Sequence, residues 1–221
     1  RKDRWGGSLE NRYRIIDEIF KRAKDRVGTF PILVKLNAYD RRRRGMRIEE
    51  AVQLSRKLEM SGCAAIEVSC GTFEDGFLTI RGNKPPIDPA MSYIFKYKRL
   101  PAWIKKMAKP ILKALIGMPK PMYRYNLSAA TEIRKHVNLP LIVVGGNHRL
   151  ADLNEIVCLG DCYHVSMSRP FIIETDIVNK IKLGKSTSSN CIMCNYCMIV
   201  GEEKPLKCYY GRMPKTKMEN K

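Results

Sequence analysis

The chain has 221 residues, of which 44% are apolar. This composition is that of an ordinary folded protein with one large or two small domains, and it excludes a wholly disordered chain. No run of eighteen uncharged apolar residues occurs, so we expect no transmembrane helix. The net charge of +19 favours anionic partners such as nucleic acid, an anionic membrane surface or phosphorylated ligands. Nucleic acid is the least favoured, because the basic residues are scattered and no nucleic-acid-binding signature is present.

The eight cysteines fall into two groups. Cys63, Cys70, Cys158 and Cys162 stand singly in apolar surroundings, as buried free thiols usually do. The other four are clustered between residues 191 and 208. This usage is not that of a secreted disulfide framework, and it predicts a cytoplasmic protein.

The first expected element is a helix over residues 8–27. Ser8 is a suitable N-cap and Gly28 ends the helix. Apolar residues at helical spacing predict one buried stripe, which consists of Ile15, Ile16, Ile19, Phe20 and Ala23.

Short apolar strands then alternate with amphipathic helices. We expect strands over residues 31–37, 63–71, 139–146 and 162–168, and helices over residues 47–62, 128–138, 150–160 and 174–184. Such continuously apolar strands predict an α/β fold with a parallel sheet covered on both faces. Four of them form either half of a (β/α)₈ barrel or a small doubly wound sheet, and periodicity alone does not separate the two.

Residues 72–127 interrupt this alternation with an insertion of 56 residues, too long for a simple loop. Between residues 81 and 124 it has eleven Lys and Arg residues, and Asp88 is the one acidic residue. Residues 90–121 mix these charges with apolar side chains, including Trp103. Three interpretations are open: a segment in contact with a membrane surface, a lid that attracts a phosphorylated substrate such as an acyl-CoA, or a solvated insertion.

Two features at the ends of expected strands suit a phosphate. Gly145 and Gly146 follow the strand "PLIVV", where backbone N–H groups without a neighbouring Cβ can approach an anion. Arg169 follows the next strand and could clamp the same group. The alternative is a plain turn at the glycines and a surface arginine.

Lys35 lies inside the apolar strand "ILVKLN". A lysine in such a place extends to solvent, pairs with a carboxylate or faces a ligand. Beside a flavin, its charge would stabilise the anionic reduced ring.

The clustered cysteines follow the spacing C-x₂-C-x₂-C-x₁₀-C and are Cys191, Cys194, Cys197 and Cys208. Zinc sites usually combine two separate C-x₂-C pairs. Three closely spaced thiolates with a distant fourth are more typical of a [4Fe–4S] cluster. Zinc and unligated thiols remain the alternatives.

Five motifs taken in order carry a family resemblance: "DRWGGSLENRYR", "VKLN", "VVGGN", "GDCYHVSMSRPFI" and "CIMCNYC". Together they resemble the C-terminal half of the old yellow enzyme family. More narrowly, they are similar to its NADH:flavin oxidoreductase branch, which includes the iron–sulfur relatives of 2,4-dienoyl-CoA reductase and trimethylamine dehydrogenase. The resemblance covers the chain except for much of residues 72–127.

The resemblance implies an FMN-binding (β/α)₈ TIM barrel, here with strands five to eight in residues 1–184 and an iron–sulfur tail in residues 185–221. By resemblance, Lys35 contacts the flavin pyrimidine, and the phosphate is held after strands seven and eight by Gly145, Gly146, Asn147, Ser168 and Arg169. Ser168 stands where the family often has glycine. His148 replaces the arginine of the family's "GGxR" motif, and Arg149 follows it. The four clustered cysteines match the cluster ligands of the iron–sulfur branch.

The implied activity is that of an FMN-dependent oxidoreductase that passes electrons between flavin, a [4Fe–4S] cluster and an organic substrate. The expected substrate is an activated alkene of the enone or enoyl-CoA type, with NAD(P)H as electron donor. The proton-donating residues belong to strands upstream of residue 1, so none can be named. We therefore expect a fragment, the product of a split gene or one subunit of a two-chain enzyme, with a complementary N-terminal half or an electron-transfer protein as partner. The alternatives are a zinc-stabilised non-enzymatic domain and a basic module that binds membrane surfaces or nucleic acid.

Overall fold

The computed structural model describes residues 2–43, 45–72, 75–76, 79–160 and 163–213. The chain forms two compact units. The first, here called the sheet unit, consists of Arg1–Asp75, Asn126–Gly145 and Asn154–Ser166. The second, here called the cysteine unit, consists of Gly76–Tyr125, Gly146–Leu153 and Met167–Lys221.

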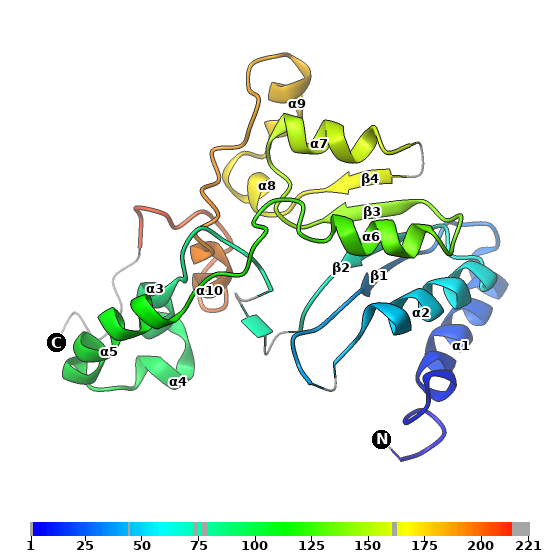
Figure 1. Ribbon diagram of the computed structural model, residues 1–221, viewed down its shortest axis with the longest axis horizontal. Coiled ribbons are helices and arrows are strands. Elements are labelled where there is room, and N and C mark those ends of the chain that lie inside the picture. Colours follow the sequence, from blue (N-terminus) through cyan, green and yellow to red (C-terminus); the bar gives the residue numbers. More distant parts are fainter. Residues whose placement is uncertain (1, 44, 73–74, 77–78, 161–162, 214–221) are drawn as a thin grey trace. The chain divides into compact units, whose positions relative to one another are not determined.

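Four parallel strands form the centre of the sheet unit (Figure 1). They are β1 (Leu33–Asn37), β2 (Ala65–Ser69), β3 (Leu141–Val144) and β4 (Tyr163–Ser166). Each strand pairs with the next along the chain, in the order β1-β2-β3-β4. This constant direction is that of a barrel segment, since a doubly wound sheet reverses its order at a switch point. The prediction of an α/β fold with part of a (β/α)₈ barrel is confirmed.

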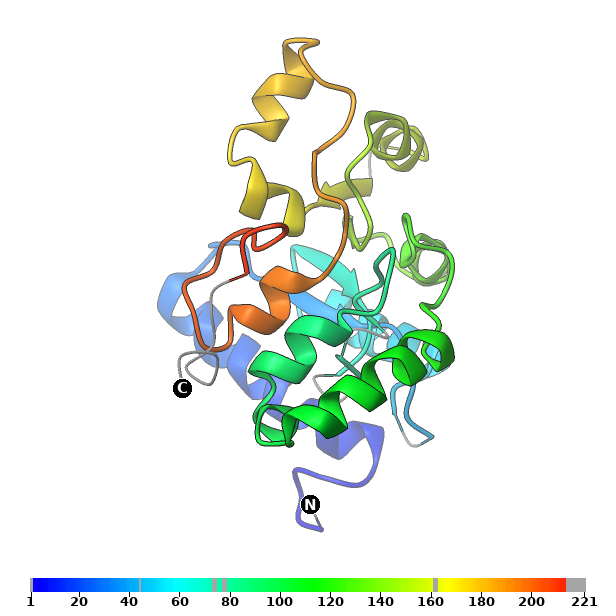
Figure 2. The same ribbon diagram turned by 90° about the vertical axis from the view of Figure 1, so that its left-hand side faces the viewer.

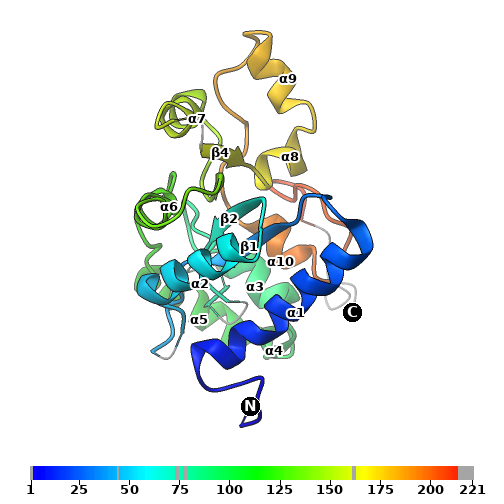
Figure 3. The same ribbon diagram turned by 90° about the vertical axis from the view of Figure 1, so that its right-hand side faces the viewer.

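One helix precedes the strands and three follow strands, all with bounds shorter than predicted. They are α1 (Leu9–Val27), α2 (Ile48–Met60), α6 (Leu127–Arg134) and α7 (Leu150–Val157). Helix α1 begins where Ser8 Oγ accepts a hydrogen bond from the Asn11 amide at 3.2 Å, and it ends at Gly28 with φ +58°. Figure 3 shows α1 and α2 beside each other, where Tyr13 Oη lies 2.7 Å from Ser61 Oγ.

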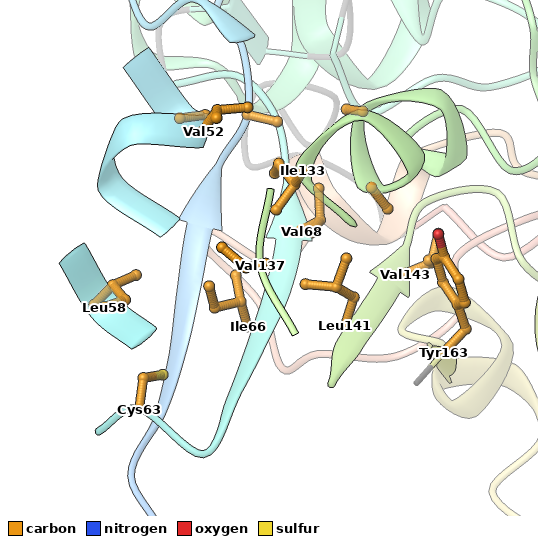
Figure 4. Close-up of a cluster of buried hydrophobic side chains, with 14 of the residues drawn as sticks. Val52, Leu58, Cys63, Ile66, Val68, Ile133, Val137, Leu141, Val143 and Tyr163 are labelled. Carbon is orange, nitrogen blue, oxygen red and sulfur yellow. The ribbon is translucent and has the colours of Figure 1, made fainter. Parts of the chain in front are cut away.

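The core of the sheet unit lies between the strands and these helices (Figure 4). Alternate strand residues face the helices, and those of β2 and β3 are fully buried: Ile66, Val68, Leu141 and Val143. Figure 4 shows them against Val52 and Leu58 of α2 and Ile133 of α6. The remaining strand residues lie on the opposite face, where Lys35, Glu67, Ile142 and His164 form one row in register. In a barrel the helices cover the outer face of the strands, and the face that packs against helices here is the one that holds the core.

The buried stripe of α1 differs from the predicted one. Tyr13 and Phe20 are buried, whereas Ile15 and Ile19 are 51% and 54% exposed. Tyr13, Ile16 and Phe20 are spaced three and four residues apart, and Ile15 and Ile19 lie on the neighbouring side of the helix.

The predicted burial of single cysteines also holds in part: Cys63 is buried, Cys158 is exposed, and Cys162 lies outside the described residues.

The cysteine unit contains the insertion and the tail. Its helices are α3 (Ile87–Tyr93), α4 (Phe95–Lys98), α5 (Ala102–Leu115), α8 (Arg169–Ile173), α9 (Ile177–Lys182) and α10 (Tyr196–Val200). Figure 2 shows the green α3 beside the orange α10. They share a small core, which consists of Ala90, Tyr93, Ile199, Val200 and Tyr209. Among the described residues, no helix is long and apolar enough to cross a bilayer.

The compact units group the insertion with the tail, whereas the sequence predicts a functional division at residue 184. That division remains a prediction about function. In packing, the tail beyond residue 184 shares its unit with the insertion of residues 76–125.

Candidate functional site

Four thiols lie around one small cavity in the cysteine unit. They belong to Cys191, Cys194, Cys197 and Cys208, the four cysteines that the sequence predicts to act together. Arg169 also lines the cavity, with Tyr209 and Tyr210. Within the described part of the chain, no three His, Cys, Asp or Glu side chains converge closely enough to hold a single metal ion.

Burial makes these thiols hard to ionise. It raises the pKa of Cys191 and Cys194, and, with the neighbouring Cys191, it raises the pKa of Cys197 to about 11. The charge of Arg169 acts in the opposite direction on Cys191 and Cys197. At neutral pH the thiols of Cys191, Cys194 and Cys197 are thus protonated, and a metal would have to displace those protons on binding.

Two left-handed residues shape the loop that carries the first three thiols. Met193 and Asn195 have φ angles of +55° and +63°. Outside glycine such angles are uncommon, and a surrounding structure must fix them. Asn195 is 1% exposed and is held at both ends of its amide. Its Nδ2 donates to the Ile80 carbonyl at 2.6 Å, and its Oδ1 accepts from Arg169 at 2.5 Å.

The insertion passes directly against this loop at Gly82. A Cβ on Gly82 would lie 2.2 Å from the Met193 carbonyl oxygen and 2.9 Å from Asn195 Nδ2. The next amide, of Asn83, donates to the same Met193 oxygen at 3.2 Å. Glycine is therefore required at residue 82 by the close approach of two backbones.

A buried carboxylate positions the first thiol. Glu174 accepts hydrogen bonds from Ser189 Oγ at 3.0 Å, from the Asn190 amide at 2.6 Å and from Asn190 Nδ2 at 2.9 Å. Ser189 Oγ in turn accepts from the Cys191 amide at 3.2 Å. Burial alone would raise the pKa of Glu174, but these bonds and the Lys180 ammonium hold that pKa below its usual value.

Arg169, predicted to clamp a phosphate, lies at the thiol cavity. Its Nη1 donates to the Arg81 carbonyl at 2.9 Å and to Asn195 Oδ1. At least this nitrogen is used to hold the cysteine loop. Ser168 is exposed and precedes α8 as its N-cap residue.

The predicted phosphate loop has the backbone that the glycines suggest. Gly145 and Gly146 have φ angles of +118° and +75°. A Cβ on Gly146 would lie 2.3 Å from the Met122 carbonyl oxygen and 2.9 Å from Tyr123 Cα. Close packing against residues 122–124 thus requires Gly146 even without a ligand. Asn147 is 3% exposed.

The two residues after Asn147 are fixed by neighbours in the cysteine unit. His148 is buried and stacks on Tyr123 at 5.3 Å between ring centroids. Burial, and then the charges of Arg169 and Arg149, lower the pKa of His148, so its ring is neutral. Arg149 forms a two-point ion pair with Asp152 and lies 3.7 Å from the Tyr123 ring. In this loop, the backbone N–H groups are therefore better hydrogen-bond donors to a phosphate than the side chains of His148 and Arg149.

Lys35 points from β1 to the face of the sheet opposite the helices, where it forms an ion pair with Glu67 of β2. Its side chain is 58% exposed. Of the three roles open to this lysine, pairing with a carboxylate is observed within the sheet unit. The predicted flavin site also draws on residues of the cysteine unit, so it stays a prediction.

Sequence reasoning missed Gly82, Glu67, Glu174 and Asn195. Asn195 had a usable signal, because an asparagine between two closely spaced cysteines favours a left-handed turn. Glu67 could have been found by pairing the charges of two neighbouring strands. Gly82 and Glu174 act through contacts with distant residues, which no local pattern reveals.

No known family profile matches the chain. It is 26% identical over 203 residues to an NADH oxidase of Thermoanaerobacter brockii, an alignment that covers 91% of this chain and 26% of that protein. Its fold matches a 2-naphthoyl-CoA reductase in complex with 2-naphthoyl-CoA, with a TM-score of 0.65 and 19% identity over 94% of this chain and 27% of that one. It also matches an old yellow enzyme homologue of Zymomonas mobilis, with a TM-score of 0.52 and 16% identity over 88% of this chain and 43% of that one.

These likenesses agree with the order of motifs in the sequence and with the parallel strands. The chain spans about a quarter of the length of the NADH oxidase that it matches. The chain is thus similar in sequence to an NADH oxidase and in fold to old yellow enzyme-like enzymes.

Proposed function

We propose that the chain is part of an FMN-dependent NAD(P)H oxidoreductase that holds a [4Fe–4S] cluster in its cysteine unit. The observation that carries the proposal is the convergence of four thiols on one cavity, in a chain related to NADH oxidases. The three closely spaced cysteines and the distant fourth follow the spacing typical of such clusters.

The spacing of the cysteines supports a cluster over zinc. Zinc sites usually combine two separate C-x₂-C pairs, whereas three closely spaced cysteines with a distant fourth are typical of a [4Fe–4S] cluster. Its irons also offset the cost of four thiolates in a buried site, where burial opposes ionisation. When bound, the cluster would supply single-electron transfer.

The resemblance in sequence motifs supports one set of residues as the flavin site. Gly145 and Gly146 have backbone angles that expose N–H groups to a phosphate, and Asn147 follows them as a buried polar residue. Ser168 and Arg169 would complete the phosphate site, with Arg169 sharing its guanidinium with the cysteine loop. Lys35 would stabilise negative charge on the flavin ring. When bound, FMN would supply hydride transfer to or from an organic substrate.

We infer an activated alkene of the enone or enoyl-CoA type as the substrate class. The resemblance in sequence motifs supports this class, as does the 2-naphthoyl-CoA reductase among the structural neighbours. No proton donor is assigned, because the resemblance places those residues on strands outside this sequence.

The test is anaerobic purification of the chain, followed by a visible spectrum and by quantification of iron, sulfide, zinc and flavin. We expect about four irons per chain and an absorbance that bleaches on reduction. Stoichiometric zinc without colour would identify a zinc-stabilised domain and overturn the redox proposal. Iron without flavin would support the cluster and show that the chain does not hold FMN by itself.

The proposed contact of Lys35 with the flavin can be tested separately from the contribution of its ion pair to stability. Since the side chain is largely exposed, the pair with Glu67 contributes at most about 1 kcal/mol to stability. Lys35→Met is therefore expected to leave the free energy of unfolding nearly unchanged and to weaken FMN binding by roughly tenfold, which corresponds to about 1.4 kcal/mol. Fluorescence titration with FMN measures this, with Lys21→Met as control. Equal affinity in both variants would contradict a flavin contact by Lys35.

Glu174 is expected to position Cys191 through Ser189 and Asn190. Glu174→Gln removes the charge from three hydrogen bonds and should lower the free energy of unfolding by about 1–3 kcal/mol. The iron content per chain should also be lower in Glu174→Gln, because Cys191 is no longer held in position. Glu202→Gln, an exposed change in the same unit, should alter neither quantity. Full iron content in Glu174→Gln would show that the carboxylate does not position the ligand.

The same carboxylate predicts a pH dependence of stability. Its pKa in the folded chain is below the ordinary glutamate value of about 4.3. The stabilisation is thus complete above that value and is lost as the pH falls through the folded-state pKa. Urea unfolding at several pH values below about 4 should show a steeper loss of stability in the wild type than in Glu174→Gln.

A further inference from the structure

One helix of the insertion exposes a row of large apolar side chains. On α5, every fourth residue over three turns is apolar and exposed: Trp103 (66%), Met107 (62%), Ile111 (56%) and Leu115 (75%). We call these four residues the α5 stripe. None of the residues of α5 is fully buried. Residues four apart lie on one side of a helix, so the stripe is a continuous apolar surface.

The orientation of α5 is fixed by the helix beside it. Asp88 of α3 forms ion pairs with Lys109 at 3.2 Å and with Lys113 at 2.9 Å. Ile104, Ala108 and Leu112 are partly buried on the inner side of α5. The stripe therefore faces away from the only acidic side chain between residues 81 and 124.

The sequence around the stripe is basic, although Asp88 pairs with Lys109 and Lys113 on the other side of α5. From Phe95 to Leu115 the sequence has seven Lys and Arg residues and no Asp or Glu. Phe95, also exposed, has the Arg99 guanidinium 4.0 Å from its ring. An apolar surface with basic borders matches the boundary between acyl chains and anionic headgroups, where lysine stems lie along apolar groups and their ammonium ends reach the phosphates.

We propose that α5 binds the surface of an anionic phospholipid membrane, with the α5 stripe among the upper acyl chains and the exposed Lys106 at the headgroups. The proposal does not depend on the redox function. The apolar stripe distinguishes this partner from nucleic acid, which would engage the lysines but gains little from four large apolar side chains. This binding needs no membrane-spanning helix, and none is present in the described part of the chain.

The test is sedimentation of the full chain with vesicles of phosphatidylcholine alone, and of phosphatidylcholine mixed with phosphatidylglycerol. The wild type is expected to bind the anionic vesicles more tightly and to be released by salt. Met107→Gln/Ile111→Gln should weaken this binding by at least about tenfold, since each side chain loses a buried apolar area. Lys106→Gln should weaken it by about fivefold.

Ile15→Gln/Ile19→Gln is the matched control. These residues also lie four apart on a helix and are similarly exposed, but Asp17 and Glu18 accompany them and form ion pairs with Lys21 and Arg22. Vesicle binding should be unchanged in this control.

Several outcomes would overturn the proposal. One is equal binding to both kinds of vesicle, or none to either. Another is a lower unfolding midpoint in Met107→Gln/Ile111→Gln, which would show that the stripe packs within the protein. Self-association that disappears in this variant would assign the stripe to a second copy. Oligonucleotide binding that survives in it, without vesicle binding, would assign the basic residues to nucleic acid.

Discussion

Replacement of Cys197 by serine is expected to abolish the bound cluster. Cys197 lines the thiol cavity, and burial raises its pKa to about 11. A serine hydroxyl ionises far less readily than a thiol and is a harder ligand, so it should not replace the thiolate on iron. Iron per chain should fall from about four to near zero, and the absorbance that bleaches on reduction should be lost.

Cys158→Ser provides the control for this experiment. Cys158 is an exposed thiol near the end of α7 and lies outside the cavity. Its iron content and spectrum should equal those of the wild type. If Cys197→Ser retained full iron and colour, the assignment of the cavity as the cluster site would be wrong. If both variants lost iron, general destabilisation and not ligand loss would be the cause.

Replacement of Gly146 by alanine is expected to destabilise the chain strongly. The new Cβ would meet the Met122 carbonyl oxygen at 2.3 Å and Tyr123 Cα at 2.9 Å, and these backbone atoms cannot move as a side chain can. The φ angle of +75° adds strain for any residue with a Cβ. Together the strain and the overpacking should lower the free energy of unfolding by about 3 kcal/mol or more.

Gly184→Ala separates the two contributions. Gly184 has a φ angle of +67°, and nothing lies within 4 Å of its added Cβ. This control should therefore lose only the conformational part, about 1 kcal/mol. Urea unfolding of the two variants measures both values. Equal losses would show that residues 122–124 do not approach Gly146 as closely as the structure indicates.

Local sequence patterns predicted the helices and strands of the sheet unit, but they did not fully predict which side of each helix is buried. The runs around Ile66 and Leu141 predicted buried strands because nearly all of their side chains are apolar. The stripe of α1 was partly wrong, because Ile15 and Ile19 are as apolar as the residues beside them. Which apolar face of a helix is buried depends on the neighbour that packs against it.

The candidate site was predictable where its spacing is local. The three-residue spacing of Cys191, Cys194 and Cys197 predicts that they share a site, and Cys208 is the next cysteine in the sequence. The parts that hold them in place are distant in sequence: Asn195 bonds to Ile80, and Glu174 bonds to Asn190. Arg169 is a further example. Its position after a strand predicted a contact with a phosphate, whereas its observed hydrogen bonds connect it to the cysteine loop.

The contact between the insertion and the cysteine loop has a consequence for the order of assembly. Ile80 and Asn195 are 115 residues apart in sequence, and Gly82 and Asn83 meet the same loop through Met193. During synthesis, the segment around residue 80 emerges long before the residues that will bind it, and such distant contacts form late. The contact is therefore complete only after residues 193–195 have been made. Until then, the segment around residue 80 lacks the hydrogen bonds that Asn195 and Met193 supply in the folded chain.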